Sequence, residues 1–266
     1  MLRDDASLFS VLLRHWRTRR GLSQLDLSLT AEVSSRHISF LETGRAQPSR
    51  EMVLILAGSL DLPLRDQNVL LRAAGFQDQF AEPSWTDGLD PVIERTLDRM
   101  LKKHEPFPMI VLGRSYDIVR ANQAAMRMLL WLVADPSALT QPPNLLRALF
   151  DPRLLRSFVL DWERVVRSLL TRVQREVVSR PSDRALADLL RELLAYPDVP
   201  ASFRQPDLTQ PTEPTLSVRL KRGERELSFL TTVTQFDAPQ NITLQELKIE
   251  SYFPLDEATE RACEEL

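Results

Sequence analysis

The sequence reads LSQLDL at residues 22–27 and VSSRHISFLETGR at residues 33–45, and these two stretches decide the fold of the N-terminal part. Each stretch combines apolar residues at helical spacing with a serine near its start. The hydroxyls of Ser23 and Ser34 can accept hydrogen bonds from the free backbone NH groups at a helix start. Gly44 suits the left-handed position that ends a helix. The pattern predicts two short helices joined by a tight turn.

Three more helices are expected around this pair. Helical spacing of apolar residues predicts them at residues 8–19, 50–60 and 64–74. The result would be a five-helix unit of about 75 residues, which is large enough to fold alone. The residues expected in its core are Leu8, Val11, Leu12, Trp16, Leu25, Leu27, Ala31, Ile38, Leu41, Met52, Val53, Leu56 and Ala57.

The residues in register across the two central helices resemble the Xre family of helix-turn-helix regulators, the fold of phage repressors. They are Gln24, Leu27, Val33, Ser34, Ile38, Leu41, Glu42, Gly44 and Arg45. The resemblance covers residues 8–74 and implies that the helix beginning at Ser35 lies in the major groove of DNA. Two positions depart from the family, since Ser28 replaces an alanine and Glu32 replaces the glycine of the turn. Glutamate tolerates positive φ poorly, so we expect a strained turn.

By this resemblance, the base edges are met by four side chains of the third helix, namely Ser35, Arg36, Ser39 and Phe40. Arg36 is the expected guanine contact because its guanidinium matches the O6 and N7 acceptor pair, and Phe40 could touch a thymine methyl group. Two plainer interpretations stay open. Phe40 could cover the core of the domain, and Arg36 could be a solvated surface residue.

The same resemblance implies contacts with DNA phosphates. Gln24 begins the second helix, where its side chain and the helix N-terminus would meet one phosphate, and Arg45 would take another. Arg17 and Glu42 occupy positions where the family often has an internal ion pair, which would set the pitch of the third helix. One such domain makes few phosphate contacts, so useful specificity implies a homodimer on two half-sites about one helical turn apart.

The composition argues against several other classes of protein. The 266 residues carry a formal net charge of −3, although residues 7–50 hold seven arginines against three carboxylates. One cysteine, Cys263, and three scattered histidines argue against disulfides and a metal site. No apolar run is long enough to span a bilayer and no signal peptide opens the chain, so we expect a cytoplasmic protein without a membrane partner. We recognise no glycine-rich phosphate loop or catalytic triad, and we expect no enzymatic activity.

The second half of the chain predicts a separate α+β domain. Polar residues and prolines mark a boundary, so we expect a helix-turn-helix domain at residues 1–80, a linker at 81–89 and a second domain at 90–256. A β-hairpin around Gly113, several helices and three further strands predict one antiparallel sheet with helices on one side. The expected helices cover residues 91–103, 123–133, 143–150, 152–178 and 183–194, the three later strands cover 216–221, 227–236 and 247–253, and a proline-rich surface connection covers 197–214.

This order of elements is similar to that of a PAS domain, and within that class it resembles the ligand-binding domain of MmyB-like regulators. The residues that carry the resemblance are YDIV at 116–119 followed by Ala121-Asn122, FDP at 150–152, DWE at 161–163 and, more loosely, FRQPDL at 203–208. The resemblance spans residues 90–254. It implies a cavity between the sheet and its helices for an apolar, acid-bearing ligand such as a fatty acid.

Eight residues are expected to line that cavity: Met109, Val111, Trp131, Phe158, Trp162, Leu220, Phe229 and Phe253. The plainer interpretation is a packed core without a cavity, since aromatic residues and methionine at such spacing are most often core. No residue stands out as an anchor for a carboxylate, and Arg167 and Arg172 are expected on the solvated face of the long helix. No cofactor is expected beyond such a ligand.

The sequence therefore predicts a transcription regulator that binds operator DNA, with a second domain that binds a small apolar ligand and controls the geometry of a dimer. Two alternatives stay open. The protein could be a constitutive repressor whose second domain only dimerises, or that domain could bind a protein partner.

Overall fold

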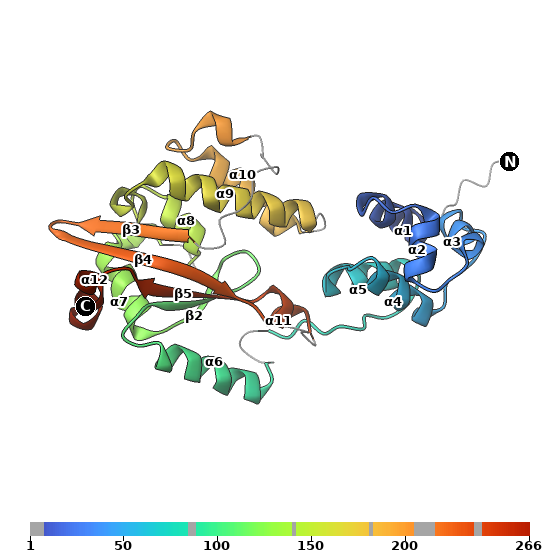
Figure 1. Ribbon diagram of the computed structural model, residues 1–266, viewed down its shortest axis with the longest axis horizontal. Helices are drawn as coiled ribbons and strands as arrows, with labels where there is room; N and C mark the ends of the chain where they lie inside the picture. Colours follow the sequence, from blue (N-terminus) through green and yellow to red (C-terminus); the bar gives the residue numbers. More distant parts are fainter. Residues whose placement is uncertain (1–7, 85–88, 140–141, 181–182, 205–215, 237–240) are drawn as a thin grey trace. The chain divides into compact units, whose positions relative to one another are not determined.

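The computed structural model describes residues 8–84, 89–139, 142–180, 183–204, 216–236 and 241–266. The chain divides into two compact units (Figure 1). The first unit comprises residues 1–83 together with 238–245, and the second unit comprises 84–237 and 246–266. The sequence alone assigns residues 238–245 to the second domain, whereas the structure groups them with the first unit.

The helices of the first unit, among the described residues, are α1 (Leu8–Arg19), α2 (Gln24–Thr30), α3 (Ser35–Glu42), α4 (Arg50–Ser59), α5 (Leu64–Ala73) and most of α11 (Ile242–Glu246). The first five confirm the predicted helix-turn-helix unit. Serine side chains explain where three of them begin. Ser23, Ser34 and Ser49 each accept a hydrogen bond from the backbone NH three residues later.

The turn between α2 and α3 is built on a residue that carries backbone strain. Glu32 lies in the left-handed region with a φ of 54°, as its departure from the usual glycine predicts. A side chain with a Cβ is disfavoured in this region because it crowds the backbone. The backbone NH of Val33 closes the turn by donating to the carbonyl of Ser28 at 2.9 Å.

The core of the first unit differs from the expected core on α1 and α2. Phe9 and Trp16 are buried, whereas Leu8, Val11 and Leu25 are 64%, 53% and 58% exposed. The prediction was wrong at Leu8 and Val11 because two apolar rows run along α1 at nearly the same spacing, and it was wrong at Leu25 of α2, where Leu27 is the buried residue. Only the packing of α1 against α3 and α5 decides which row is buried.

Helix α11 is held to the rest of the first unit by hydrogen bonds. Gln245 Oε1 accepts a bond of 2.8 Å from the backbone NH of Leu64, at the start of α5, where Pro63 supplies no side-chain cap. Thr243 Oγ1 donates to the carbonyl of Pro83 at 2.7 Å. Nothing in the sequence pattern predicts this helix, because its contacts join segments that lie far apart in the chain.

The second unit is an α+β structure, as predicted. Its helices are α6 (Pro91–Lys103), α7 (Gln123–Leu132), α8 (Leu145–Phe150), α9 (Trp162–Ser179), α10 (Arg184–Ala195) and α12 (Glu257–Glu265), with 3-10 turns at Pro136–Ala138, Arg156–Phe158 and Ala201–Arg204. Its strands are β1 (Met109–Leu112), β2 (Ile118–Ala121), β3 (Leu216–Arg222), β4 (Arg225–Thr234) and β5 (Lys248–Pro254). Residues 205–214 of the predicted proline-rich connection and residues 85–88 of the predicted linker lie outside the described residues.

The strands form one antiparallel sheet in the order β2-β1-β5-β4-β3. The hairpin around Gly113 joins β1 to β2, and a second hairpin around Gly223 joins β3 to β4. Strand β5 lies between them, with Glu250 opposite Ile110 of β1 and Tyr252 opposite Thr231 of β4. The last strand of the chain therefore lies in the middle of the sheet.

The long helix begins later than predicted. Helix α9 starts at Trp162, whereas the sequence pattern extends it back to residue 152. The preceding residue, Asp161, lies in the left-handed region with a φ of 51°, and a residue in that conformation cannot continue a right-handed helix. The Asp161 carboxylate forms an ion pair of 2.7 Å with Arg219 of β3.

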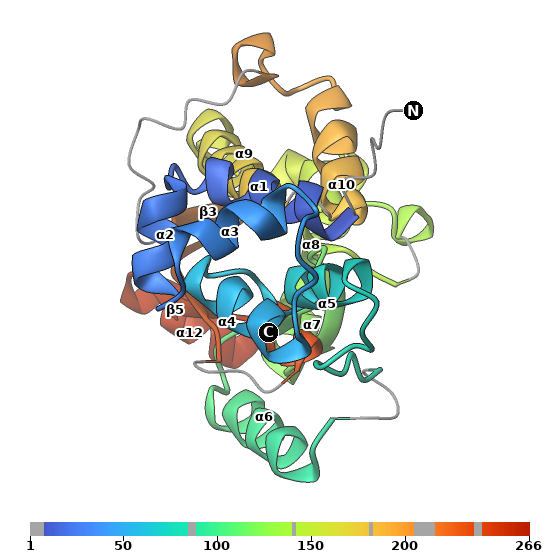
Figure 2. The same ribbon diagram turned by 90° about the vertical axis from the view of Figure 1, so that its right-hand side faces the viewer.

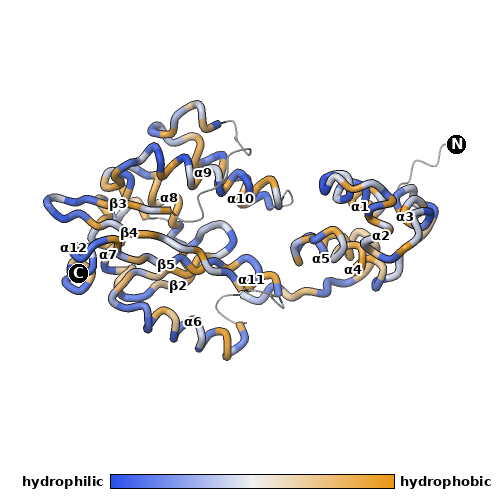
Figure 3. Tube along the Cα trace, in the orientation of Figure 1, coloured by the Kyte–Doolittle hydropathy of each residue, from blue (hydrophilic) through white to orange (hydrophobic). Residues whose placement is uncertain are grey.

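Helices lie on both sides of the sheet. Figures 1 and 2 show α9 and α10 on one side and α6 on the other, whereas the sequence predicts helices on one side only. Hydrophilic and hydrophobic residues alternate along α6 (Figure 3), as expected for a helix with one buried face. All four residues of β1 are buried, and successive side chains of a strand point to opposite faces. Ile110 and Leu112 thus join the core of α7 to α10, while Met109 and Val111 point to the other face.

Candidate functional site

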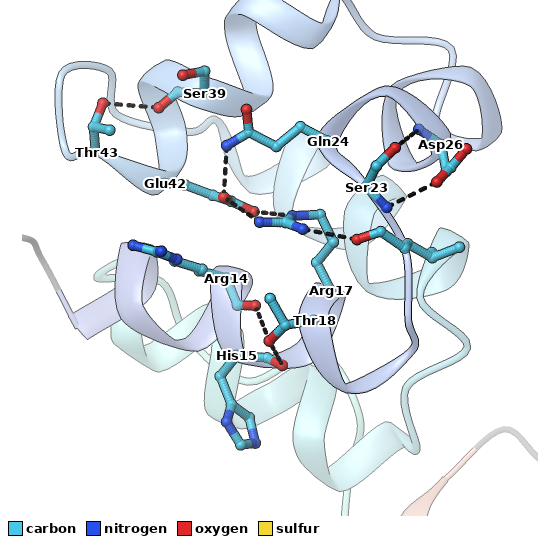
Figure 4. Close-up of polar contacts among 11 residues, drawn as sticks. Arg14, His15, Arg17, Thr18, Ser23, Gln24, Asp26, Ser39, Glu42 and Thr43 are labelled. Carbon is cyan, nitrogen blue, oxygen red and sulfur yellow. Dashed lines mark hydrogen bonds and ion pairs between the residues drawn. The ribbon is translucent and has the colours of Figure 1, made fainter.

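A buried ion pair joins α1 to α3 in the first unit (Figure 4). Arg17 Nε and Nη2 donate to Glu42 Oε1 at 2.6 Å and Oε2 at 2.9 Å, and Nη1 donates to the carbonyl of Leu22 at 2.7 Å. Gln24 Nε2, at the start of α2, donates to Glu42 Oε2 at 2.8 Å. Three helices meet at one carboxylate, and the predicted pair between Arg17 and Glu42 is confirmed.

Both members of this pair are held in their charged forms. Burial raises the pKa of the Glu42 carboxyl, but the hydrogen bonds from Arg17 and Gln24 outweigh burial and hold the pKa below its usual value. The hydrogen bond to Glu42 also raises the pKa of the Arg17 guanidinium. A bidentate pair of this kind fixes geometry as well as charge. It therefore fixes how α3 is presented at the surface.

The outward face of α3 carries the predicted base-reading side chains. Ser35 and Arg36 are exposed, and Ser39 and Phe40 are half-buried. The guanidinium of Arg36 lies 5.2 Å from the centre of the Phe40 ring. Phe40 is not among the described apolar side chains that pack against the core of the first unit. This placement favours an outward-facing role for Phe40, and its contact with a base stays a prediction.

The two residues predicted to contact phosphates differ in their surroundings. Arg45 is exposed just after the end of α3, and its backbone NH donates to the carbonyl of Phe40 at 2.9 Å. Gln24 is half-buried, and its amide already donates to Glu42. A phosphate contact through that amide requires Gln24 to use its second NH or to release Glu42. Both phosphate contacts stay predictions.

The second unit contains a cavity of about 40 Å³ between the sheet and helices α7, α8 and α9. Leucines and valines form most of its wall, together with Met128 of α7. The polar residues of its lining are Tyr116, Thr231, Glu250 and Tyr252, and we call this set the polar end. Thr231 lies opposite Tyr252 in the sheet, and Glu250 lies two residues before Tyr252 on the same face of β5. An apolar cavity with a few convergent polar groups is the usual form of a small-molecule site.

A buried ion pair lies next to this polar end. Tyr116 Oη donates to Glu176 Oε1 at 2.7 Å, and Lys248 Nζ donates to Glu176 Oε2 at 2.8 Å. Lys248 Nζ also lies 4.0 Å from the centre of the Tyr116 ring. Burial lowers the pKa of Lys248, and the negative charge of Glu176 opposes that effect. The positive charge of Lys248 is therefore committed to Glu176.

Glu250 is buried without such a partner. Among the described residues no cation lies within ion-pair distance of its carboxyl, and burial raises its pKa. The nearby Tyr252 hydroxyl acts in the opposite direction and lowers the pKa, as do the positive charges of Arg172 and Lys248. Burial, followed by the nearby carboxylates Glu250 and Glu176, raises the pKa values of Tyr252 and Tyr116 well above the usual value.

The structure places one of the eight predicted wall residues, Leu220, at this cavity. Met109, Val111 and Phe253 occupy the opposite face of β1 and β5, because Ile110, Glu250 and Tyr252 occupy the cavity face and side chains alternate. Phe253 is 42% exposed and its ring lies 5.1 Å from that of His104. For these three residues the predicted wall is corrected.

The four remaining aromatic residues pack around the core and do not line the cavity. Phe229 is fully buried, and its ring meets that of Tyr252 edge to face at 5.7 Å. Trp131, Phe158 and Trp162 are half-buried against the same core. The ring of Trp162 is 5.0 Å from that of Phe150. These large aromatic rings fill the space between helices and strands, so they belong to the packed core that surrounds the cavity.

Sequence reasoning missed the polar end altogether. Its members come from β4, β5 and the turn before β2, and the pattern of each segment shows only strand residues. One signal is present in β5, which reads KIESYFP and places two charged residues, Lys248 and Glu250, in a stretch with strand-forming residues. Charged residues two apart in a central strand share one face, and both must be accommodated there.

Two other kinds of site receive no support. In the described part of the chain, no group of three histidine, cysteine, aspartate or glutamate residues is placed to hold a metal ion. Among the described helices, none has the length and apolar character needed to cross a membrane.

Comparison with known proteins gives two matches. The family model described as the MmyB-like transcription regulator ligand binding domain matches residues 93–266, and a helix-turn-helix model matches residues 13–67. A search of the curated proteins gave no match. The matched domains are those of a transcription regulator and not of an enzyme.

Proposed function

The chain belongs to the MmyB-like transcription regulators, and we propose that it binds a palindromic DNA site as a homodimer whose geometry is controlled by a small apolar ligand. Helix α3 reads the bases through Ser35, Arg36, Ser39 and Phe40. The second unit holds the ligand, a molecule with a fatty-acid-like chain. The observation that carries the DNA-binding part is the outward face of α3, fixed by the buried pair of Arg17 and Glu42.

The dimer follows from the small number of contacts that one unit can make. Seven arginines in residues 7–50 give the first unit a local positive charge, but one of them, Arg17, forms an ion pair with Glu42 and is not available to DNA. Affinity for DNA grows with the number of phosphates neutralised. Two copies on half-sites about one helical turn apart double that number and match a palindrome.

The ligand must displace side chains in order to enter. The cavity measures about 40 Å³, whereas an engineered apolar cavity that binds benzene measures about 150 Å³. Met128 and several leucines of α7 and α8 form the wall, and methionine in particular adapts its shape at low cost. A ligand chain therefore shifts α7, α8 or β5 when it binds.

Strand β5 offers a route from the cavity to the first unit. It carries Glu250 and Tyr252 at the cavity, and it follows α11 by a single residue, Leu247. Gln245 of α11 hydrogen-bonds the start of α5 in the first unit. A ligand that moves β5 thereby changes the support of α5. The ligand alters DNA affinity only if it binds two arrangements of the dimer with different affinity.

The DNA-binding part is tested with Arg36→Ala in the full chain. DNA fragments are first enriched from a random library by the unaltered protein, and affinity is then measured by fluorescence anisotropy. Loss of the guanine contact should cost about 1–3 kcal/mol on the enriched site and relax base preference at one position. Arg72→Ala on α5, whose partner is Asp78, serves as the matched control and should leave binding nearly unchanged. Equal weakening on all sequences would show that Arg36 contacts phosphate.

One observation favours the alternative of a constitutive repressor, namely the small size of the cavity. Mass spectrometry of an organic extract of the denatured protein separates the two functions. A stoichiometric molecule with an apolar chain supports ligand control. An empty extract, together with DNA affinity that no added alkyl compound changes, supports a second unit that only dimerises.

A further inference from the structure

Two of the three hydroxyl hydrogens at the polar end of the cavity, those of Tyr116 and Thr231, are already used by the protein. Tyr116 Oη donates to Glu176 Oε1 at 2.7 Å, and Thr231 Oγ1 donates to the carbonyl of Leu216 at 2.9 Å. The Tyr252 hydroxyl is close enough to the carboxyl of Glu250 to lower its pKa. A hydroxyl has one hydrogen and two acceptor lone pairs. Tyr116 and Thr231 can therefore offer a ligand acceptor lone pairs only.

The described residues that line the cavity also offer no positive charge to a ligand. Among the described residues that line the cavity there is no lysine, arginine or histidine, and Glu250 is the one carboxylic acid. Lys248 is close by but donates to Glu176 at 2.8 Å. Arg172 acts electrostatically on Glu250 and on both tyrosines, yet it does not line the cavity.

We propose that the ligand enters this cavity with a hydrogen-bond donor that bears no negative charge, a hydroxyl or an ammonium group, and places it against Glu250 and the oxygens of Tyr116 and Tyr252. This inference rests on the proposed function, because it concerns the polar end of the same apolar ligand. A carboxylate would meet the acceptor lone pairs of Tyr116 and Thr231 beside the buried carboxyl group of Glu250, and only the single hydrogen of a protonated Glu250 could be donated to it. Among molecules with a fatty-acid-like chain, the cavity thus selects an alcohol or an amine over the acid.

The choice between an alcohol and an amine depends on the protonation state of Glu250. An ionised Glu250 would attract an ammonium group strongly, because a charge-assisted hydrogen bond in a dry site is stronger than a neutral one. A protonated Glu250 would pair with a hydroxyl group, since each partner then has one hydrogen to donate and lone pairs to accept. An ionised Glu250 therefore predicts an amine as the preferred ligand, and a protonated Glu250 predicts an alcohol.

The test measures binding of octan-1-ol, octylamine and octanoate to the full-length protein by calorimetry. The three probes share one chain length and differ in the polar end. At least one of the first two should bind about tenfold or more tightly than octanoate. Tightest binding by octanoate would overturn the proposed polar end and leave ligand control intact. Absence of binding by all three would overturn both proposals.

Substitutions at Glu250 and Tyr252 test whether the polar group of the ligand lies against these residues, and they distinguish an amine from an alcohol. Glu250→Gln keeps the shape of the side chain and removes its charge, so octylamine should lose about tenfold in affinity while octan-1-ol changes little. Glu163→Gln, at an exposed position of α9, is the matched control and should change neither. Unchanged octylamine and octan-1-ol binding in a doubly altered Glu250→Leu/Tyr252→Phe protein would overturn the proposal. So would octanoate binding that is the tightest of the three and is abolished by Arg172→Gln.

Discussion

Glu42 in the first unit and Glu250 in the second are both buried, but their surroundings are opposite. Glu42 receives two hydrogen bonds from Arg17 and one from Gln24, and its pKa is lowered. Glu250 has no cation within ion-pair distance among the described residues, and burial raises its pKa. The same side chain is thus stabilised as an anion in one unit and left without a counter-charge in the other.

Glu42 therefore stabilises the fold, whereas Glu250 is available to interact with a ligand. All the strong hydrogen-bonding capacity of Glu42 is used between α1, α2 and α3, so this residue positions the DNA-facing helix. Glu250 lines a cavity and keeps acceptor capacity that the protein leaves unused. A buried carboxyl with a shifted pKa in a cavity is a common mark of a functional site. Three predictions follow the comparison from the largest effect to the smallest.

The largest effect is expected for Glu42→Ala. The substitution leaves the Arg17 guanidinium buried without its carboxylate, which typically costs about 3–5 kcal/mol. Urea denaturation followed by circular dichroism should show the loss in the transition of the first unit, and DNA affinity should fall with it.

Two further variants sharpen this first prediction. Replacing both partners, as in Arg17→Met with Glu42→Leu, should recover much of the stability because no charge is left unpaired. Asp78→Ala breaks the exposed pair with Arg72 and should cost less than about 1 kcal/mol. A loss for Glu42→Ala as small as that for Asp78→Ala would mean that the buried pair has no special role.

A smaller and opposite effect is expected for Glu250→Gln. Glu250 has a raised pKa in the folded chain, so the unfolded chain binds fewer protons between the two pKa values, and stability falls as pH rises through them. The neutral glutamine should remove this fall and stabilise the second unit at neutral pH, where the buried carboxyl of Glu250 is least stable.

The pH dependence of melting checks the comparison directly. Glu42 has a lowered pKa, so its contribution is present above the usual pKa of a glutamate and is lost as pH falls through the folded value. Calorimetry across acidic and neutral pH should therefore show that the stability difference between parent and variant changes with pH in opposite directions for Glu42→Ala and Glu250→Gln. A stability of the second unit that is equally independent of pH in the parent and in Glu250→Gln would contradict the unpaired state of Glu250.

The smallest effect is expected from two left-handed residues, one in each unit. Glu32 and Asp161 have φ values of 54° and 51°. Glycine adopts this region without strain, so Glu32→Gly should stabilise the first unit by about 1 kcal/mol. Asp161→Gly should gain less, because it also removes the ion pair with Arg219. Glu32→Ala is the control, since alanine keeps the Cβ and should give no gain. Equal thermal shifts for the glycine and alanine variants would show that Glu32 is unstrained.

Local signals in the sequence predicted most elements of the fold. Serine caps and glycine stops located α2 and α3, and hairpins around Gly113 and Gly223 located four of the five strands. The start of α9 was wrong because a left-handed Asp161 leaves no mark in an apolar pattern. The core prediction was wrong at Leu8, Val11 and Leu25 because neighbouring rows of a helix look alike until a partner helix covers one of them.

The candidate sites were predicted to different degrees. The α3 face follows from one continuous stretch, so the sequence could name its residues, and their contacts with DNA stay predictions. The cavity wall draws on α7, α8, α9, β3, β4 and β5, and of the eight named residues only Leu220 lies there.

By itself the sequence determined where the helices and strands lie, and it identified a helix-turn-helix unit followed by a ligand-binding α+β unit. Only the tertiary structure decided which face of β1 and β5 meets the cavity, that Glu250 and Tyr252 lie at its polar end, and that residues 238–245 join the first unit. The physical reason is that caps and turns are local, whereas a strand buried on both faces has no alternating pattern to show its orientation. The orientation of β1 and β5 is fixed in part by the hydrogen bonds between them, which join residues more than a hundred positions apart in the chain.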